Sequence, residues 1–449
     1  MEDGNGYKYR GLYFELNSPT VAIETHGCKL NQADSWELAA EFAESGFRIV
    51  ELGQPADLYL LNSCTVTHIA DRKARNAIRS ARRLNPSATV IATGCYAQRV
   101  PDELRSIEDV DIVLGNSDKS SIVQKAVQFM GFTNPIENVG YGELGLDTVS
   151  KSRLMVKIQH GCNQVCAYCI VPKVRGRERS VPTDELVSRV KQASKSGFKE
   201  VVLTGTQLGS YGFELPGTDL KSLIGLILSQ TDIPRLRVSS LQPQEIDTEL
   251  LDLWSDNRLC PHFHLPLQSG SDKILKLMRR RYDSELYLKA VDLIRKNVSG
   301  ASVTADVIAG FPNEQNDDFD QTLHLCQLIK FADMHIFPYS IRPGTSAAHN
   351  KLQVDNHVKK DRTNRLMSLA REQSHDFREM SLGTTRSVLW EHRLQDDPNG
   401  LWIGLTDNYI RVATDSDASL GNSITKATLT SFNEDKVICE VIQSNGCSV

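Results

Sequence analysis

The sequence predicts an α/β protein built from an N-terminal open parallel α/β domain, a central partial (β/α)6 barrel and a C-terminal small all-β barrel. Short apolar runs rich in Val, Ile and Leu alternate with segments of helical periodicity, which is typical of parallel sheets covered by helices. A turn-rich stretch interrupts this alternation, and short strands replace it near the C-terminus. At 449 residues the chain also exceeds what one hydrophobic core usually organises. The predicted boundaries are 18–131, a linker at 132–152, 153–382 and 384–449.

The composition is that of a soluble globular protein, with 40% hydrophobic and 24% charged residues. No apolar run is long enough to cross a bilayer, and the N-terminus shows neither a secretory nor a mitochondrial signal. We therefore expect a cytoplasmic protein with no membrane partner. Because cytoplasmic thiols stay reduced, the ten cysteines are candidates for metal binding or catalysis rather than for disulfides.

Three apolar strands in the first third of the chain each end in a cysteine. VAIETHGC ends at Cys28, LYLLNSC at Cys64 and TVIATGC at Cys95, and a predicted helix follows each one. In open α/β sheets ligands bind beyond the carboxyl ends of the strands, so the three thiols should converge on one edge. The alternative is three unrelated core cysteines, since free cysteine is often buried.

The central part of the chain alternates strand and helix about six times. This pattern predicts a parallel barrel, or a large part of one, with its active site at the carboxyl ends of the strands. Residues 183–196 and 317–330 are among the predicted helices. The predicted strands are Arg153–Ile158, Glu200–Thr204, Leu236–Ser240, Phe263–Leu267, Val303–Ile308 and Met334–Pro338.

After about Gly383, four apolar runs separated by polar turns predict the small β-barrel. The runs are RSVLWEH, WIGLTDNYIRVAT, ITKATLTSF and KVICEVI.

The loop after the first predicted barrel strand reads HGCNQVCAYCIVP and spaces Cys162, Cys166 and Cys169 as C-x3-C-x2-C. Three thiolates on one loop can reach one metal centre. A four-iron cubane takes four ligands, so this trio would leave one iron open to bind substrate. His160 could instead complete a tetrahedral zinc site. The spacing favours the cluster and leaves zinc as the alternative.

The net charge of −5 neither demands nor excludes a nucleic-acid partner, but two segments concentrate cations. Residues 68–86 carry a charge of +5 on a predicted amphipathic helix, and the loop KVRGRERS carries +3 just past the cysteine loop. Both suit a phosphate-bearing substrate, and both could also be ordinary solvated surface. The candidate RNA-binding residues are Arg72, Arg75, Arg79, Arg82, Arg83, Lys173, Arg175, Arg177 and Arg179.

The cysteine loop resembles the signature of the radical S-adenosylmethionine superfamily. Nearly the whole chain further resembles the methylthiotransferases of that superfamily, through HGCKLNQADS, NSCTVT, TGCYAQ, CNQVCAYCIVPKVRGRERS, LTGTQLGSYG, SSLQP, HLPLQSGSDKILKLMRRRY, DVIAGFPNE and IFPYSIRPGTSAA. The resemblance implies two 4Fe-4S clusters. Cys162, Cys166 and Cys169 would hold the catalytic cluster, which binds and cleaves S-adenosyl-L-methionine, and Cys28, Cys64 and Cys95 an auxiliary cluster that carries or delivers sulfur.

Six residues near strand ends are candidates for binding the cofactor. By the family pattern Gly205 and Thr206 should lie near the methionine moiety, and glycine lets backbone approach a ligand closely. Ser239 and Ser240 could hydrogen-bond the ribose, and Gln268 and Asp306, at comparable strand ends, could orient cofactor or substrate. Each of the six could equally serve as an ordinary turn or helix cap.

The C-terminal domain is similar to the small RNA-binding β-domain called TRAM, through GLTDNYIRV in particular. From residue 384 onward it holds five basic and nine acidic residues, so strong non-specific RNA affinity is not expected. Trp390, Trp402 and Tyr409 could stack on bases, although filling the barrel core is the simpler role. The family often continues the KVRGRERS run with a further basic residue, where this chain has Val181.

Several motifs resemble the subgroup that methylthiolates carbon 2 of threonylcarbamoyladenosine next to the anticodon in tRNA. The alternatives are methylthiolation of isopentenyladenosine in tRNA, methylthiolation of a ribosomal-protein aspartate, and a non-enzymatic iron-sulfur or zinc protein that binds RNA. The expected partners are tRNA and an electron donor such as flavodoxin or ferredoxin.

Overall fold

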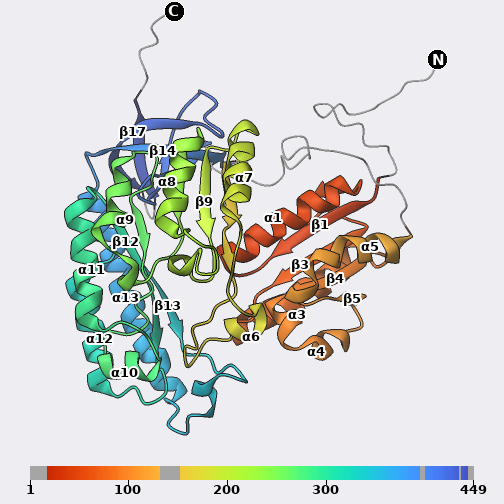
Figure 1. The fold of residues 1–449 in the computed structure, drawn as a ribbon, viewed down its shortest axis with the longest axis horizontal. Coiled ribbons are helices and arrows are strands. Elements are labelled where there is room, and N and C mark those ends of the chain that lie inside the picture. The colour runs from red at the N-terminus through yellow and green to blue at the C-terminus, as the bar shows by residue number, and fades with distance from the viewer. Residues whose placement is uncertain (1–17, 132–151, 395–399, 434–435, 443–449) are drawn as a thin grey trace, which may run out of the picture.

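The protein is described from a computed structural model, which covers residues 18–131, 152–394, 400–433 and 436–442. A parallel sheet domain, a half-open parallel barrel and a small closed β-barrel follow one another along the chain (Figure 1), so the predicted fold class is confirmed. The predicted linker at 132–152 lies outside the described residues except for Ser152. None of the described helices has the length and apolar content needed to cross a bilayer.

The N-terminal sheet has five parallel strands in the order β2-β1-β3-β4-β5. The three central strands are those that the sequence predicted, and the two edge strands were missed because they are only three and two residues long. The strands are Thr20–Thr25 (β1), Arg48–Val50 (β2), Leu58–Ser63 (β3), Thr89–Gly94 (β4) and Ile112–Val113 (β5). The helices are Lys29–Glu44 (α1), His68–Leu84 (α2), Cys95–Arg99 (α3), Pro101–Arg105 (α4) and Ile122–Met130 (α5), with a 3-10 turn at Asn116–Ser121.

The central barrel consists of two three-stranded parallel sheets, β6-β9-β10 and β11-β12-β13. A parallel bridge between Leu236 and Leu259 joins them, so six strands form one curved sheet, as predicted. The strands are Arg153–Lys157 (β6), Glu200–Thr204 (β9), Arg235–Val238 (β10), His262–His264 (β11), Ser302–Ala309 (β12) and Asp333–Pro338 (β13). Two short strands, Gln159–His160 (β7) and Arg179–Ser180 (β8), flank the cysteine loop.

The helices of the barrel cover its outer face (Figure 1). Leu186, Val190, Leu223 and Ile224, on the first two long helices, are fully buried against the strands. The helices are Val171–Arg175 (α6), Thr183–Lys195 (α7), Leu220–Gln230 (α8), Thr248–Asp252 (α9), Asp272–Leu277 (α10), Ser284–Asn297 (α11), Asn316–Ile329 (α12) and Asn356–Met380 (α13).

The C-terminal barrel is closed in the order β14-β15-β16-β18-β17. The run WIGLTDNYIRVAT was predicted as one strand and forms two, because the chain turns at Tyr409, which has a φ of 74°. The bond between the indole Nε1 of Trp390 and Thr425 Oγ1 (2.9 Å) holds that buried ring in the core. The strands are Thr385–Arg393 (β14), Trp402–Thr406 (β15), Arg411–Thr414 (β16), Ile424–Asn433 (β17) and Lys436–Val441 (β18).

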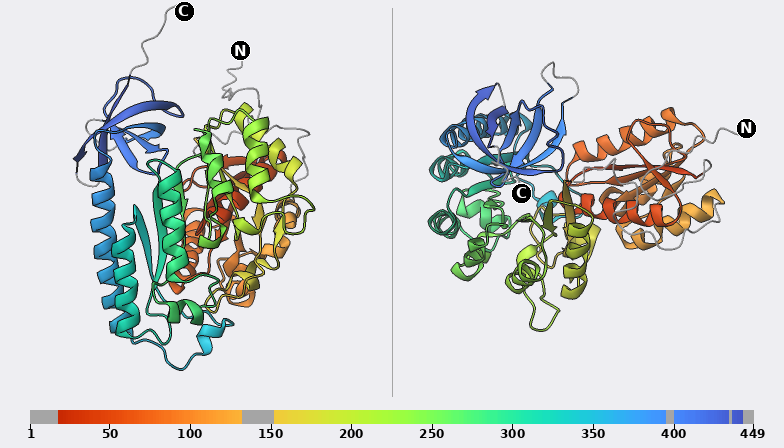
Figure 2. Two further views of the ribbon diagram at one scale, coloured as in Figure 1. Left: turned by 60° about the vertical axis from the view of Figure 1, so that its left-hand side comes forward. Right: turned by 90° about the horizontal axis from the view of Figure 1, so that it is seen from above.

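The C-terminal barrel sits over the amino ends of the central strands, at the end of α13 (Figure 2). Glu200 lies fully buried between Arg235 and Arg237, at 2.8 Å from each guanidinium, and the two cations hold the pKa of Glu200 down to about 2. The guanidinium groups also donate to the carbonyl oxygens of Leu405, Thr406 and Asp407. A buried ionic cluster therefore fixes this domain to the floor of the barrel.

A second ionic cluster fixes the N-terminal domain to the open side of the barrel. Asp34 on α1 is 3% exposed and pairs with Lys157 (2.9 Å), Arg175 (3.1 Å) and Lys119. These three cations come from β6, α6 and the 3-10 turn of the N-terminal domain, and they lower the pKa of the Asp34 carboxyl. One carboxylate thus ties three segments together.

A third cluster lies nearer the carboxyl ends of the strands. Asp71 on α2 pairs with Arg99 (2.9 Å) and with Arg342 (2.7 Å), which follows β13. Arg342 is 2% exposed and also donates to the carbonyl of Thr65. Both clusters thus bridge the N-terminal domain and the barrel beside a predicted site cysteine.

We expect Asp34→Asn to lower the free energy of unfolding by about 3–5 kcal/mol, because it leaves three cations without their shared buried anion. Since folding lowers the pKa of Asp34, its contribution is full above the pKa of about 3.9 of an unfolded aspartate and is lost as the pH falls below it. Urea unfolding at pH 7 and pH 3 measures both effects. Asp102→Asn, at an exposed pair with Arg105, is the control and should leave the midpoint unchanged; an equally silent Asp34→Asn would contradict the assignment.

Candidate functional site

The cysteines of the N-terminal domain meet at one edge of its sheet. Cys28, Cys64 and Cys95 follow β1, β3 and β4, which are neighbours in the sheet. Gly27 has a φ of 100°, and a Cβ there would lie 2.6 Å from the Cβ of Cys64 and 2.9 Å from its Sγ. Only glycine therefore lets the loop after β1 close against Cys64, and the convergence expected from the sequence is present.

The three cysteines of this trio differ in their exposure to solvent. Cys64 and Cys95 are buried, whereas Cys28 is exposed. Burial raises the pKa of the Cys64 thiol to about 12, so a thiolate there requires a compensating charge such as a metal centre. The amide Nδ2 of Asn116 donates to Cys95 Sγ at 3.6 Å and to the carbonyl of Val174 at 2.8 Å.

Backbone contacts shape the loop that carries the second trio. Gly161 has a φ of 73°, and a Cβ there would lie 1.9 Å from the carbonyl oxygen of Arg177. The next amide, of Cys162, donates to the carbonyl of Gly176 at 3.1 Å, and the Cys169 amide donates to the Cys166 carbonyl at 3.2 Å. The loop is thus folded back on itself and presents three half-buried thiols.

A cation lies against this second trio. The guanidinium of Arg280 donates to Cys166 Sγ at 3.7 Å and packs over the ring of Tyr282 at 4.8 Å. Burial raises the pKa of the Cys169 thiol to about 12. A half-buried arginine beside half-buried thiols is suited to a centre that carries negative charge.

Helix α6 connects the two trios directly. It begins two residues after Cys169, and Ile170 and Val174 pack against Cys95 in a small buried cluster. The last residue of α6 is Arg175. Its guanidinium pairs with Asp34 and lies near the thiols of Cys28 and Cys95. Helix α6 therefore lies between the two cysteine sites, because it starts just after Cys169 and packs against Cys95.

The spacing of the thiols argues against mononuclear zinc. Bonds of about 2.3 Å in a tetrahedron place zinc-bound sulfurs about 3.8 Å apart. Within the described chain, the only groups of three candidate ligands that lie within 4.8 Å of one another are His264 with Asp306 and His335, and an exposed group on α13. Neither cysteine trio is that tight, and His160 joins neither, so neither trio has the geometry of a tetrahedral zinc site.

The first two predicted cofactor-binding residues lie just past the end of a barrel strand. Gly205 and Thr206 follow β9, where the amides of Thr206 and Gln207 donate to Gln159 Oε1 at 2.9 and 3.0 Å. The buried hydroxyl of Thr206 has no hydrogen-bond partner among the described residues, as expected if a bound ligand supplies one.

The other four cofactor candidates divide between the strand ends and the barrel interior. Ser239 and Ser240 follow β10, and Gln268, with a φ of 65°, follows β11. Asp306 lies within β12 rather than at its end, bonded to His335 Nδ1 at 3.1 Å and 3.4 Å from His264 Nε2. Its predicted place at a strand end was therefore wrong.

A buried polar chain that the sequence did not reveal leads to the cysteine loop. Gln164 of that loop contacts Gln242 Nε2 at 3.4 Å, Gln242 contacts Gln207, and Gln207 Nε2 donates to Glu245 Oε1 at 2.5 Å. Burial raises the pKa of Glu245 to about 7. The sequence signal was SSLQPQE, a polar run after a buried strand, but nothing local distinguishes it from a capped turn.

The structure divides the predicted RNA-binding residues into two sets. Arg82 bonds Asp111 and three backbone carbonyls, Arg75 bonds Tyr96 and Glu103, and Arg175 belongs to the Asp34 cluster. These three already have intramolecular partners. The remaining six are exposed and make no ion pair within the described chain: Arg72, Arg79, Arg83, Lys173, Arg177 and Arg179.

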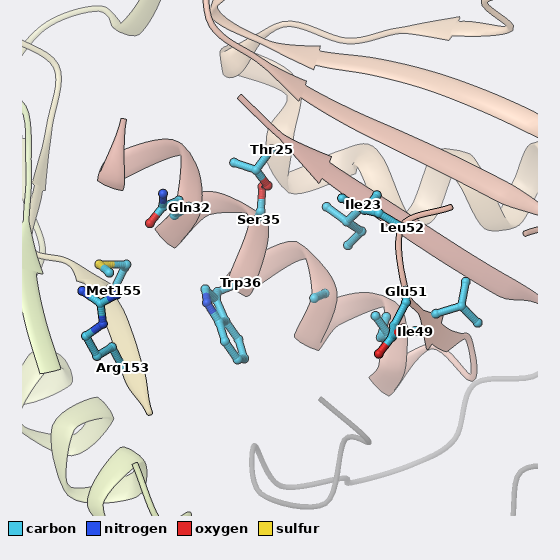
Figure 3. A pocket seen from close by; sticks show the side chains of 12 residues that line it. Ile23, Thr25, Gln32, Ser35, Trp36, Ile49, Glu51, Leu52, Arg153 and Met155 are labelled. Atoms are coloured by element: carbon cyan, nitrogen blue, oxygen red, sulfur yellow. The ribbon is translucent and has the colours of Figure 1, made fainter. Parts of the chain in front are cut away.

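Two cavities border the N-terminal domain. One of 480 Å³ lies between α1, β1 and β6, with Trp36 on one side and Arg153 and Met155 on the other (Figure 3). No cysteine lines it. The other, of 460 Å³, lies beside α6 and is lined by Lys173, Arg177, Arg179 and the Asp34 cluster. Its cations suit a phosphate group.

The chain was compared with known proteins. A family model described as Uncharacterized protein family UPF0004 matches residues 20–115, and that of the Radical SAM superfamily matches residues 156–326. Threonylcarbamoyladenosine tRNA methylthiotransferase MtaB of Aquifex aeolicus is 39% identical over 417 residues, which are 90% of this chain and 98% of that protein. The chain belongs to the tRNA methylthiotransferase family. The family expected from the sequence is thus confirmed.

Further relatives of this methylthiotransferase extend the comparison. The protein of the same name in Bacillus subtilis is 35% identical and covers 88% of this chain and 90% of its own length. A tRNA-2-methylthio-N(6)-dimethylallyladenosine synthase of Methylacidiphilum infernorum is 34% identical, with coverages of 83% and 84%. The radical S-adenosylmethionine methyltransferase TsrM of Kitasatospora setae has a TM-score of 0.54 at 15% identity over 74% of this chain and 77% of its own, which shows a shared fold.

We expect Glu245→Gln to stabilise the methylthiotransferase more at pH 8 than at pH 5. Because folding raises the pKa of Glu245, its stabilising contribution is full below the pKa of about 4.3 of an unfolded glutamate and is lost as the pH rises through about 7. Glutamine keeps the neutral form at every pH. Urea unfolding of the wild type and of Glu245→Gln at pH 5 and pH 8 measures this effect. If the stability difference between the two proteins were the same at both pH values, the pKa of Glu245 would not be raised by folding.

Proposed function

We propose that this protein is an enzyme that methylthiolates carbon 2 of threonylcarbamoyladenosine next to the anticodon in tRNA. The observation that carries the proposal is that α6 follows the cysteine loop and packs against Cys95 of the other trio, in a chain whose MtaB relatives match over almost their full length. The domains we assign are 18–131 for the auxiliary cluster, 153–382 for the radical barrel and 384–449 for the TRAM-like barrel.

Each trio is proposed to hold a 4Fe-4S cluster with one iron free of protein ligands. Cys162, Cys166 and Cys169 are assigned to the catalytic cluster, and Cys28, Cys64 and Cys95 to the auxiliary one. When bound, S-adenosylmethionine supplies both the radical chemistry and the methyl group. The exposed position of Cys28 leaves the auxiliary site open on that side.

The protein's own groups would bind and orient the cofactor. The unpartnered hydroxyl of Thr206 lies beside Gln207 of the polar chain that ends at the cysteine loop, so a hydroxyl is available to an amino-acid moiety. Ser239, Ser240 and Gln268 remain candidates for the ribose and adenine. Arg280 would stabilise the charge of the catalytic cluster.

The nucleic-acid surface is assigned to the exposed face of α2 and to the loop after α6. The loop after α6 lines the cationic cavity, and the face of α2 contributes the exposed guanidinium groups of Arg72, Arg79 and Arg83. We place the enzyme in the cytoplasm, where its tRNA substrate and reduced thiols occur, and expect a flavodoxin or ferredoxin to supply electrons.

Mass spectrometry of nucleosides from host tRNA, with and without the gene, tests the proposal. Loss of the methylthio derivative of threonylcarbamoyladenosine is the expected result. Loss of methylthiolated isopentenyladenosine, or of a modified ribosomal-protein aspartate, would support one of the alternative substrates. Unchanged tRNA and ribosomal protein would leave the non-enzymatic alternative.

The two trios should separate in function. Reconstituted protein should hold about eight iron atoms, and Cys162→Ala, Cys166→Ala and Cys169→Ala together should leave about four. Cys28→Ala should still yield deoxyadenosine from S-adenosylmethionine and yield no methylthiolated RNA, because only the auxiliary site is disrupted. A Cys28→Ala protein that modifies RNA at the normal rate would remove the auxiliary cluster from the mechanism.

We expect the triple substitution Arg72→Gln, Arg79→Gln and Arg83→Gln to weaken tRNA binding and to flatten its salt dependence by about 0.9 for each phosphate that is no longer neutralised. Filter binding across a range of salt concentrations measures both. Lys195→Gln, Lys289→Gln and Lys296→Gln, at exposed positions on the outer helices α7 and α11, form the matched control. Equal weakening by the two sets would indicate a diffuse charge effect and no defined surface.

A further inference from the structure

Polar side chains from β12, β13, the C-terminal barrel and the start of α1 gather on the inner side of the barrel, and the space between them is called the chamber below. On β13 the side chains alternate: Met334 and Ile336 pack into the core on the side of α13, whereas His335 and Phe337 are exposed on the opposite face, toward the interior. Asp306 pairs with His335 across β12 and β13. Exposed side chains on the inner face of this edge strand indicate a space that a ligand can occupy.

The floor of this chamber comes from the C-terminal barrel. Tyr409, held at positive φ in the turn between β15 and β16, stacks on His262 with ring centres 4.2 Å apart and planes 8° from parallel. The guanidinium of Arg237 lies 5.0 Å from the same ring. His262 is 2% exposed, and its Nδ1 has no hydrogen-bond partner among the described residues. Below the floor lies a cavity of 280 Å³ lined by Thr304, Asp333 and Tyr409, among others.

The wall opposite β13 carries a lysine without an anionic partner. Lys29, the first residue of α1, places its ammonium 5.5 Å from the Tyr409 ring, within the electrostatic field of His262 and His335. No carboxylate in the described part of the chain forms an ion pair with it. A half-buried ammonium in this position is costly unless an anion binds beside it.

The charges around the chamber favour an anionic group. The two positive charges of Arg235 and Arg237 outnumber the single negative charge of Glu200. Lys29 adds a further positive charge. Asp306 is matched by His335, whose pKa it raises. Asp333, at the amino end of β13, is the remaining acid on that strand.

We propose that Lys29 and His335 bind the carboxylate of the threonylcarbamoyl group, and that this contact selects that nucleoside over one with an apolar dimethylallyl group. The inference rests on the proposed function and assigns its substrate specificity to named residues. Lys29 follows Cys28 directly, so a substituent held by the ammonium keeps the purine beside the auxiliary site. An apolar group in the same place would leave the ammonium desolvated and unpaired, which disfavours it.

Lys29→Met tests the assignment on anticodon stem-loop RNAs that carry threonylcarbamoyladenosine, its methyl ester or dimethylallyladenosine. For the wild type we expect kcat/KM to be about tenfold to a hundredfold higher for the acid than for the ester, the range of one charge-assisted hydrogen bond. For Lys29→Met we expect kcat/KM with the acid to fall by that factor, and kcat/KM with the ester to change little. Lys125→Met, at an exposed position on α5, is the matched control and should change neither.

Iron content and deoxyadenosine formation without RNA show whether the variant keeps its clusters. If Lys29→Met loads iron poorly, His335→Gln and the acid-to-ester ratio of the wild type still test the inference. The inference would be overturned if the wild type had the same kcat/KM for the acid as for the ester. It would also be overturned if Lys29→Met lowered kcat/KM equally for the two. If the wild type modifies neither RNA bearing a threonylcarbamoyl group, the proposed function fails as well.

Discussion

The carboxylate of Asp34 is the point where the N-terminal domain, the first barrel strand and the cysteine loop are held together. Lys119, Lys157 and Arg175 approach it from three different segments. Because a buried anion is stable only while its cations surround it, the three segments are fixed relative to one another. Both cysteine trios, and the lysine that follows Cys28, take their positions from this arrangement.

Each of the three domains contributes a different part of the sites. The N-terminal sheet supplies the auxiliary site and one wall of the inner chamber, and the barrel supplies the catalytic site and the opposite wall. The C-terminal barrel, although it resembles an RNA-binding domain, directs Tyr409 into the floor of the chamber. Its acidic surface is compatible with this role because contact with the barrel is made by carbonyl oxygens that accept from Arg235 and Arg237.

Local sequence patterns predicted the fold and the cysteines well, because each strand, helix and C-x-x-C spacing is encoded by neighbouring residues. The patterns could not identify Glu245, or the partnership of Asp34 with Arg175 across 141 positions in the chain, since both depend on tertiary contact. For the same reason Arg175 looked like a loop cation available to RNA. The turn at Tyr409 was missed because an aromatic residue at positive φ is rare.

Helix α6 has a consequence for how this fold tolerates change. Its five residues span about 7.5 Å, and the same short helix follows Cys169 and packs against Cys95, so its length and register set how the two sites face each other. A single inserted residue there would rotate Arg175 by about 100° away from Asp34. The ion pair between Arg175 and Asp34 therefore depends on the exact length of this helix.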